Sequence, residues 1–142
     1  IKKVVLTAAW SGYARLPMFE PCLKNTVETL TNAGIQVVIV KDVAQLNRDA
    51  VMKMAKAAMA GKGNDSIGVP FETHLAANKQ VNTILESLAG PQVTVVDPAP
   101  YFVNGDGLWR ALYQGKPLYR DTAHLTVAGA LRLVPLFREI LK

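Results

Sequence analysis

Three short apolar segments constrain the fold of this chain more than any other feature. They span residues 3–9, 35–40 and 92–96, and the second is β-branched and almost wholly apolar. A segment of this kind, bounded by charged or turn-forming residues, is typical of a strand buried in a parallel sheet. Because segments with helical patterns separate them, we predict strand–helix–strand units with right-handed crossovers.

Three segments between these strands have the pattern of helices. The first begins at Pro17 and ends before Gly34, a residue suited to a helix C-terminus. The second spans residues 47–61, which are rich in alanine and methionine, and the third spans residues 70–88. The apolar residues expected to face the core are Leu23, Val27 and Leu30 in the first helix, and Leu75, Val81, Ile84, Leu85 and Leu88 in the third.

Turn-forming residues organise the remainder of the chain. We predict turns at 61–65, 104–107 and 114–117, and residues 108–113 alternate as a hairpin strand would. Thr126 can cap a last helix, in which Pro135 predicts a kink or a restart. This order of elements predicts a three-layer α/β/α sandwich with a parallel sheet.

Composition narrows the class of protein. A chain of 142 residues, 50% of them hydrophobic, suits one domain or most of one, and it contains no apolar run long enough to span a bilayer. The net charge of +5 is scattered along the chain, which gives little support for nucleic-acid binding. The single cysteine, Cys22, excludes an internal disulfide, and two distant histidines make no zinc cluster. We therefore predict neither a metal nor a cofactor.

Asp121 and His124 form the most informative pair in the sequence. They lie three residues apart, where a polar loop meets an apolar helix. An imidazole can take a proton from a hydroxyl, while a nearby carboxylate fixes its tautomer and stabilises the imidazolium. Two structural roles remain open: a lone histidine is often only hydrogen-bonded, and an aspartate before a helix is often a cap.

A nucleophile for this pair is missing from the sequence. The only serines are Ser11, Ser66 and Ser87, and none lies in a Gly-Asp-Ser or Gly-x-Ser-x-Gly turn. The pattern therefore predicts the acid–base half of a hydrolase-type site.

Residues 4–13, 97–102 and 115–130 resemble the SGNH (GDSL-like) hydrolases, in particular the SGNH domains fused to bacterial membrane O-acyltransferases. The most specific match is the stretch YRDTAHLT at residues 119–126, and the resemblance covers almost the whole chain. It implies an SGNH-hydrolase (flavodoxin-like) fold in which residues 1–142 are the C-terminal part of one domain. It also implies that Asp121 and His124 belong to a Ser-His-Asp triad whose serine lies upstream of Ile1, so that this chain alone is expected to be inactive.

The chain departs from the family pattern at two places. Relatives commonly have a cysteine pair where this chain has Val103 and Trp109. Simpler SGNH hydrolases have an oxyanion-hole asparagine where this chain has Trp10, a residue equally suited to packing. Backbone N–H groups at Ala9, Trp10 and Ser11 are therefore the candidates for binding the oxyanion and the substrate.

The resemblance also implies partners and a location. The expected reaction is transfer of an acyl group, acetyl in the first instance, to a cell-envelope polysaccharide through an acyl-serine. The parent chain is expected to carry an N-terminal membrane acyltransferase domain, which would tether this domain on the periplasmic or extracytoplasmic side of the inner membrane. The alternatives are a carbohydrate esterase with the same triad and a non-catalytic glycan-binding or docking module. A flavodoxin-like nucleotide binder ranks last, because no Gly-rich phosphate loop follows the first two strands.

Overall fold

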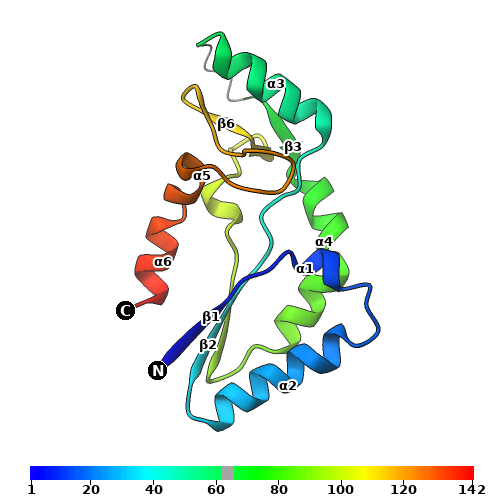
Figure 1. Ribbon diagram of the computed structural model, residues 1–142, viewed down its shortest axis with the longest axis vertical. Helices are drawn as coiled ribbons and strands as arrows, with labels where there is room; N and C mark the ends of the chain where they lie inside the picture. The colour runs from blue at the N-terminus through cyan, green and yellow to red at the C-terminus, as the bar shows by residue number, and fades with distance from the viewer. Residues whose placement is uncertain (62–65) are drawn as a thin grey trace. The chain divides into compact units, whose positions relative to one another are not determined.

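The computed structural model describes residues 1–61 and 66–142 (Figure 1). Most of the turn expected at 61–65 lies outside the described residues. The chain forms two compact units, each built from two long stretches of sequence and one residue at the C-terminus. The first unit contains residues 1–42 and 77–98 with Leu141, and the second contains residues 43–76 and 99–140 with Lys142.

The first unit is built on a three-stranded parallel sheet. Its strands are β1 (Lys3–Leu6), β2 (Gln36–Val40) and β4 (Val93–Val96), in the order β1-β2-β4. Val37 lies between Val4 and Val93 in the register of the sheet. The predicted parallel sheet is therefore confirmed, whereas the three-layer arrangement stays a prediction.

Helices cover one face of this sheet. Side chains alternate between the two faces of a strand, so Val37, Ile39 and Val93 share one face. They pack in one apolar cluster with residues of α1 (Trp10–Tyr13), α2 (Phe19–Asn32) and α4 (Phe71–Ser87). The buried members of the cluster are Trp10, Leu23, Val27, Val37, Ile39, Val81, Leu85 and Val93.

The buried stripe of α4 differs from the predicted one. Leu75 is 38% exposed, whereas His74 and Asn78 are buried. The positions 74, 78, 81 and 85 follow one another at helical spacing, so the stripe has the expected period but is shifted by one residue at its N-terminal end. His74 is buried because its ring lies 4.7 Å from the ring of Trp109, centroid to centroid. His74, a polar residue with an aromatic partner, is thus buried where the hydropathy pattern predicted Leu75.

The second unit contains two small antiparallel sheets. One pairs β3 (Gly68–Pro70) with β5 (Leu108–Arg110), and the other pairs β6 (Leu112–Tyr113) with β7 (Lys116–Pro117). The single strand predicted over residues 108–113 is thus divided at Ala111, whose N–H donates to the carbonyl of Ile67 at 2.8 Å. The turn predicted at 114–117 is confirmed: it joins β6 to β7, and Gln114 and Gly115 both have positive φ.

Trp109 is the central side chain of the second unit. It is fully buried, and its ring stacks on Phe102 with 5.2 Å between centroids. Its indole N–H donates to the hydroxyl of Tyr119 at 2.8 Å. Val103 and Trp109, which stand where relatives have cysteines, face each other in a β-bridge. Backbone pairing therefore joins the two positions without a disulfide.

Helices complete the second unit. Asn47 caps α3 (Arg48–Met59) by accepting from the N–H of Ala50 at 2.8 Å, and η1 (Ala99–Tyr101) follows β4. Thr126 caps α5 (Val127–Leu131), as predicted, and α6 (Val134–Ile140) is the restart indicated by Pro135. Within residues 1–61 and 66–142 no helix has both the length and the apolar character needed to cross a membrane.

A substitution at Gly129 tests the packing of α5 against the loop before it. A Cβ at this position would overlap the carbonyl oxygen of Leu118. We expect Gly129→Ala to lower the free energy of unfolding by about 1–3 kcal/mol, because the backbone of Leu118 must shift. Urea denaturation measures the change. Gly12→Ala is the matched control, because a Cβ there meets nothing within 4 Å; equal stability of the two variants would contradict the packing described here.

Candidate active site

Asp121 and His124 lie in a loop that the backbone closes on itself. Tyr119 and Leu125 form a β-bridge, and the N–H of Arg120 donates to the carbonyl of His124 at 2.8 Å. The N–H of Leu46 donates to the carbonyl of Thr122 at 2.8 Å. These contacts hold the two ends of the loop and its tip. The fold therefore defines the positions of the Asp121 and His124 side chains.

Tyr119 anchors this loop in the core of the second unit. It is 1% exposed, and its hydroxyl accepts from the indole of Trp109. Burial raises the pKa of Tyr119, an effect that the hydrogen bond from Trp109 opposes. Tyr119 therefore serves as a neutral structural residue rather than as an acid or base of the site.

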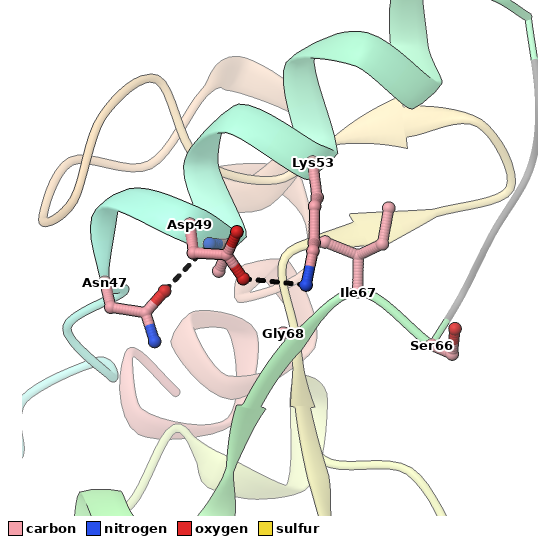
Figure 2. Close-up of a pocket in the computed structure, with 7 residues that line it drawn as sticks. Asn47, Asp49, Lys53, Ser66, Ile67 and Gly68 are labelled. Atoms are coloured by element: carbon pink, nitrogen blue, oxygen red, sulfur yellow. Dashed lines mark hydrogen bonds and ion pairs between the residues drawn. The ribbon is translucent and has the colours of Figure 1, made fainter.

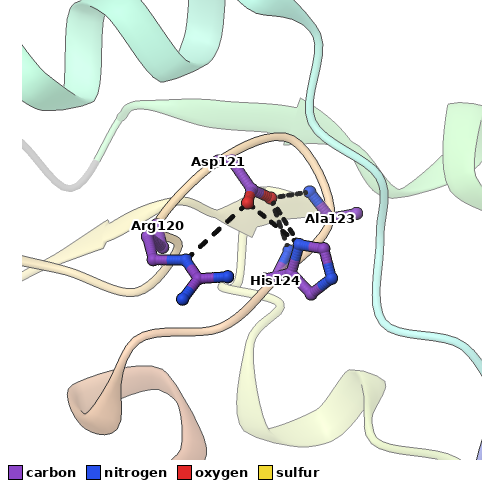
Figure 3. Close-up of polar contacts among 4 residues, drawn as sticks. All are labelled: Arg120, Asp121, Ala123 and His124. Carbon is purple, nitrogen blue, oxygen red and sulfur yellow. Dashed lines mark hydrogen bonds and ion pairs between the residues drawn. The ribbon is translucent and has the colours of Figure 1, made fainter.

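The carboxylate of Asp121 accepts several hydrogen bonds from its own loop (Figure 3). Its Oδ1 accepts from the backbone N–H groups of Ala123 and His124, both at 2.8 Å. These two bonds, Ala123 first, lower the pKa of Asp121 to about 2, and the His124 side chain adds to the effect. The side chain therefore closes an Asx-type turn and stays ionised at neutral pH.

The imidazole of His124 uses one nitrogen for Asp121 and leaves the other open (Figure 3). Its Nδ1 lies 3.0 Å from Oδ1 and 2.9 Å from Oδ2 of Asp121. Within the part of the chain that the structure describes, Nε2 has no hydrogen-bond partner. The side chain is 69% exposed. A base held at Nδ1 by a carboxylate and open at Nε2 can take a proton from an incoming hydroxyl.

The structure bears on the two structural roles left open for this pair. Thr126, not Asp121, caps the following helix, since its hydroxyl accepts from the N–H of Gly129. The exposed ring of His124 is also unlike that of His74, which is buried among aromatic side chains. Asp121 is thus engaged with its own loop and with His124.

Arg120 lies beside the pair without joining it closely. Its Nε is 3.8 Å from Oδ2 of Asp121, and its side chain is 73% exposed. An exposed ion pair at this distance contributes little to stability.

Trp10 and Ser11, the predicted oxyanion-binding residues, belong to the first unit with Ala9. The N–H groups of Trp10 and Ser11 donate to the two oxygens of Asp42 at 2.8 and 2.9 Å. The Trp10 indole donates to the carbonyl of Val40 at 2.7 Å, and its ring is buried. Burial and this hydrogen bond agree with the packing role considered for the Trp10 side chain. Oxyanion binding by this segment stays a prediction, and it requires Asp42 to release these two N–H groups.

Ser87 lies in a helix, and Ser66 borders a pocket of the second unit. The hydroxyl of Ser87 donates to the carbonyl of Ile84 at 2.7 Å on α4, and Ser66 lines a surface pocket with Asn47 and Lys53 (Figure 2). The polar groups of that pocket are already engaged: Asn47 caps α3, and Lys53 pairs with Asp49 at 2.7 Å. Among the described residues, no group of three or more His, Cys, Asp or Glu could hold a metal ion.

Comparison with models of protein families identifies the chain. Residues 1–139 match the model described as SGNH domain (fused to AT3 domains). The chain belongs to this family. Neither the curated proteins nor the solved structures contain a match to this SGNH domain.

Membership in the family supports a general class of chemistry for this SGNH domain. It supports a role in acyl transfer or ester hydrolysis, and an acyltransferase domain in the parent chain that associates with a membrane. The three parallel strands with their helices are compatible with an α/β hydrolase-like fold. The substrate and the roles of individual residues are matters for proposal.

The lowered pKa of Asp121 gives a pH-dependent prediction. A carboxyl whose pKa is lower in the folded than in the unfolded protein stabilises the fold above its ordinary pKa. This contribution is lost as the pH falls from about 4 to about 2. We therefore expect the stability of wild-type protein relative to Asp121→Asn to decline over this range. An NMR titration of the Asp121 carboxyl carbon should give a midpoint near 2, and a midpoint at the ordinary carboxyl value would contradict the hydrogen bonding described.

Proposed function

We propose that this SGNH domain supplies the acid–base pair for transfer of an acyl group, acetyl in the first instance, to a hydroxyl of a cell-envelope polysaccharide. The observation that carries the proposal is the geometry at His124: Nδ1 bonded to an ionised carboxylate, Nε2 exposed and unpartnered within the described chain. The family match supports the general class of reaction.

The first half-reaction forms an acyl-serine. A serine from a segment upstream of Ile1 gives its hydroxyl proton to Nε2 of His124, while its oxygen bonds to the acyl carbonyl carbon. The tetrahedral intermediate then breaks the bond between that carbon and the donor oxygen or sulfur. The imidazolium returns the proton to the departing donor, so that His124 ends the step neutral.

The second half-reaction transfers the acyl group to the acceptor. A glycan hydroxyl gives its proton to Nε2 and attacks the acyl-serine, and the serine oxygen leaves with the proton from His124. Asp121 keeps its charge throughout, because its low pKa makes it a poor proton acceptor and a good partner for imidazolium. Backbone N–H groups at Ala9, Trp10 and Ser11 remain the candidates for the negatively charged oxygen of each intermediate.

The same residues serve an esterase equally well. Water in place of the glycan hydroxyl would make the domain a carbohydrate esterase with the same triad. In both reactions we expect the domain to work on the extracytoplasmic side of the membrane, tethered by the acyltransferase domain of its parent chain. A non-catalytic glycan-binding module would retain the fold and have no use for His124.

His124→Ala in the full chain, including its upstream segment, tests the proposed base. We expect kcat for an acyl ester to fall about 10²–10⁴-fold with little change in KM, because the lost proton transfer occurs only in the transition state. Asp121→Asn should also lower kcat, since the amide cannot stabilise the imidazolium. Asp106→Asn, an exposed carboxylate on the turn before β5, is the matched control and should retain wild-type turnover. Undiminished turnover by His124→Ala would refute the role of His124 as the base.

A second experiment tests the source of the nucleophile. Residues 1–142 alone should not hydrolyse acyl esters, because the serine is proposed to lie upstream. Adding the upstream segment should restore turnover, and replacing its Gly-Asp-Ser serine by alanine should abolish it. Ester hydrolysis by residues 1–142 alone would show that the nucleophile lies within this chain.

A further inference from the structure

Two arginines share one aromatic ring in the second unit. The guanidinium carbon of Arg132 lies 4.3 Å from the ring centroid of Tyr113, and that of Arg110 lies 4.9 Å from it. Cation–π contacts at these distances restrict each planar group to the neighbourhood of the ring. Both positive charges therefore lie within roughly 10 Å of each other, about one Debye length at ~0.1 M salt.

Backbone carbonyls fix both guanidinium groups further. Nε of Arg110 donates to the carbonyl of Phe102 at 3.1 Å, and Nε of Arg132 donates to the carbonyl of Tyr101. These two carbonyls are consecutive in the chain, at the end of η1. Each arginine is therefore oriented through Nε, and its terminal nitrogens remain as donors for another group.

A third cation lies directly across the hairpin from Tyr113. Lys116 on β7 is the cross-strand neighbour of Tyr113 on β6, so the two side chains emerge on the same face of that hairpin. Among the described residues no carboxylate lies within ion-pair distance of Arg110, Arg132 or Lys116. The group consisting of Arg110, Arg132 and Lys116 around Tyr113 is called the cationic cluster below.

The cationic cluster has a cost that a purely structural role does not explain. Like charges held close together repel, and arginines with a structural role commonly pair with carboxylates. Here the guanidinium groups are held in place and left without an acidic partner within the described chain. A ligand that brings its own negative charge would remove the repulsion and use the terminal nitrogens in paired hydrogen bonds.

We infer that the cationic cluster binds the carboxylate or phosphate groups of an anionic glycan. This inference rests on the proposed function, since it names the class of polysaccharide that the domain modifies. It concerns binding and not the chemical step, so it can fail without the acid–base pair failing. The planar fork of arginine matches both carboxylate and phosphate oxygens, and the experiment separates these two sources.

Calorimetric titration of the full chain tests the inference with three probes: oligogalacturonate, polyglycerol phosphate and a neutral malto-oligosaccharide of similar length. We expect one or both anionic probes to bind more tightly than the neutral one, with affinity that falls as salt rises. The tighter of the two identifies carboxylate or phosphate as the natural group. Equal affinity for all three probes would overturn the inference.

Variants connect the binding to the cluster. Arg110→Gln with Arg132→Gln should weaken binding of the anionic probe about tenfold or more, since it removes both oriented charges. Arg48→Gln with Arg138→Gln removes the same net charge from exposed helix positions and should leave the affinity within about twofold. Lys116→Gln breaks no hydrogen bond or ion pair of the described chain, so it tests the cluster even if the double arginine variant does not fold. We expect this variant to bind the anionic probe about threefold more weakly.

The remaining outcomes are equally decisive. Wild-type affinity in the folded double variant Arg110→Gln, Arg132→Gln would refute the cluster as the binding site. If the double variant does not fold, wild-type affinity in Lys116→Gln would refute it instead. So would an equal loss in the Arg48→Gln, Arg138→Gln control. His124→Ala should bind the anionic probe as wild-type does. Loss of turnover with retained binding in that variant would show that His124 acts in the chemical step and that the cationic cluster binds the glycan independently of it.

Discussion

The hydrogen bonds accepted by the carboxylate of Asp121 order the proposed acid–base pair. Two backbone N–H groups, from Ala123 and His124, fix the orientation of the carboxylate, and the carboxylate in turn holds Nδ1 of His124. The pair is exposed, so its order comes from short-range geometry and not from burial. An exposed base with one nitrogen held and one nitrogen open is suited to a partner hydroxyl that arrives from another segment.

The buried side chains of the second unit give this loop its support. Trp109 packs on Phe102 and donates to Tyr119, the residue that precedes Arg120 and Asp121. The carbonyl of Phe102 also orients Arg110 of the cationic cluster. A single aromatic core thus stands behind both the proposed acid–base pair and the proposed glycan site. Disturbing that core would affect both, so the variants that test turnover and glycan binding change only polar side chains.

Much of the fold could be predicted from local patterns. The three parallel strands, the helix beginning after Pro17, the Thr126 cap and the restart at Pro135 all follow from hydropathy period and residue conformational preference. The pairing of Asp121 with His124 was also accessible, because three residues of a tight turn are enough to bring the two side chains together. These features depend on residues close in sequence.

The features that escaped prediction depend on residues far apart in sequence. Strand β3 has three residues, including a glycine and a proline, and is defined only by its partner β5. Burial of His74 requires Trp109, and the bonds from Trp10 and Ser11 require Asp42. The cationic cluster likewise joins Arg110 to Arg132 through Tyr113. A single sequence carries no signal for such pairings, because each residue also fits an ordinary surface or core role.

The tautomer of His124 shows directly whether its imidazole can act as the proposed base. Long-range ¹H–¹⁵N correlation spectra, recorded where the imidazole is neutral, distinguish a protonated ring nitrogen from an unprotonated one. We expect the proton on Nδ1, facing Asp121, with Nε2 unprotonated, and a loss of this preference in Asp121→Ala. A proton on Nε2 in the wild-type protein would contradict the account, because that nitrogen could not then accept a proton from serine.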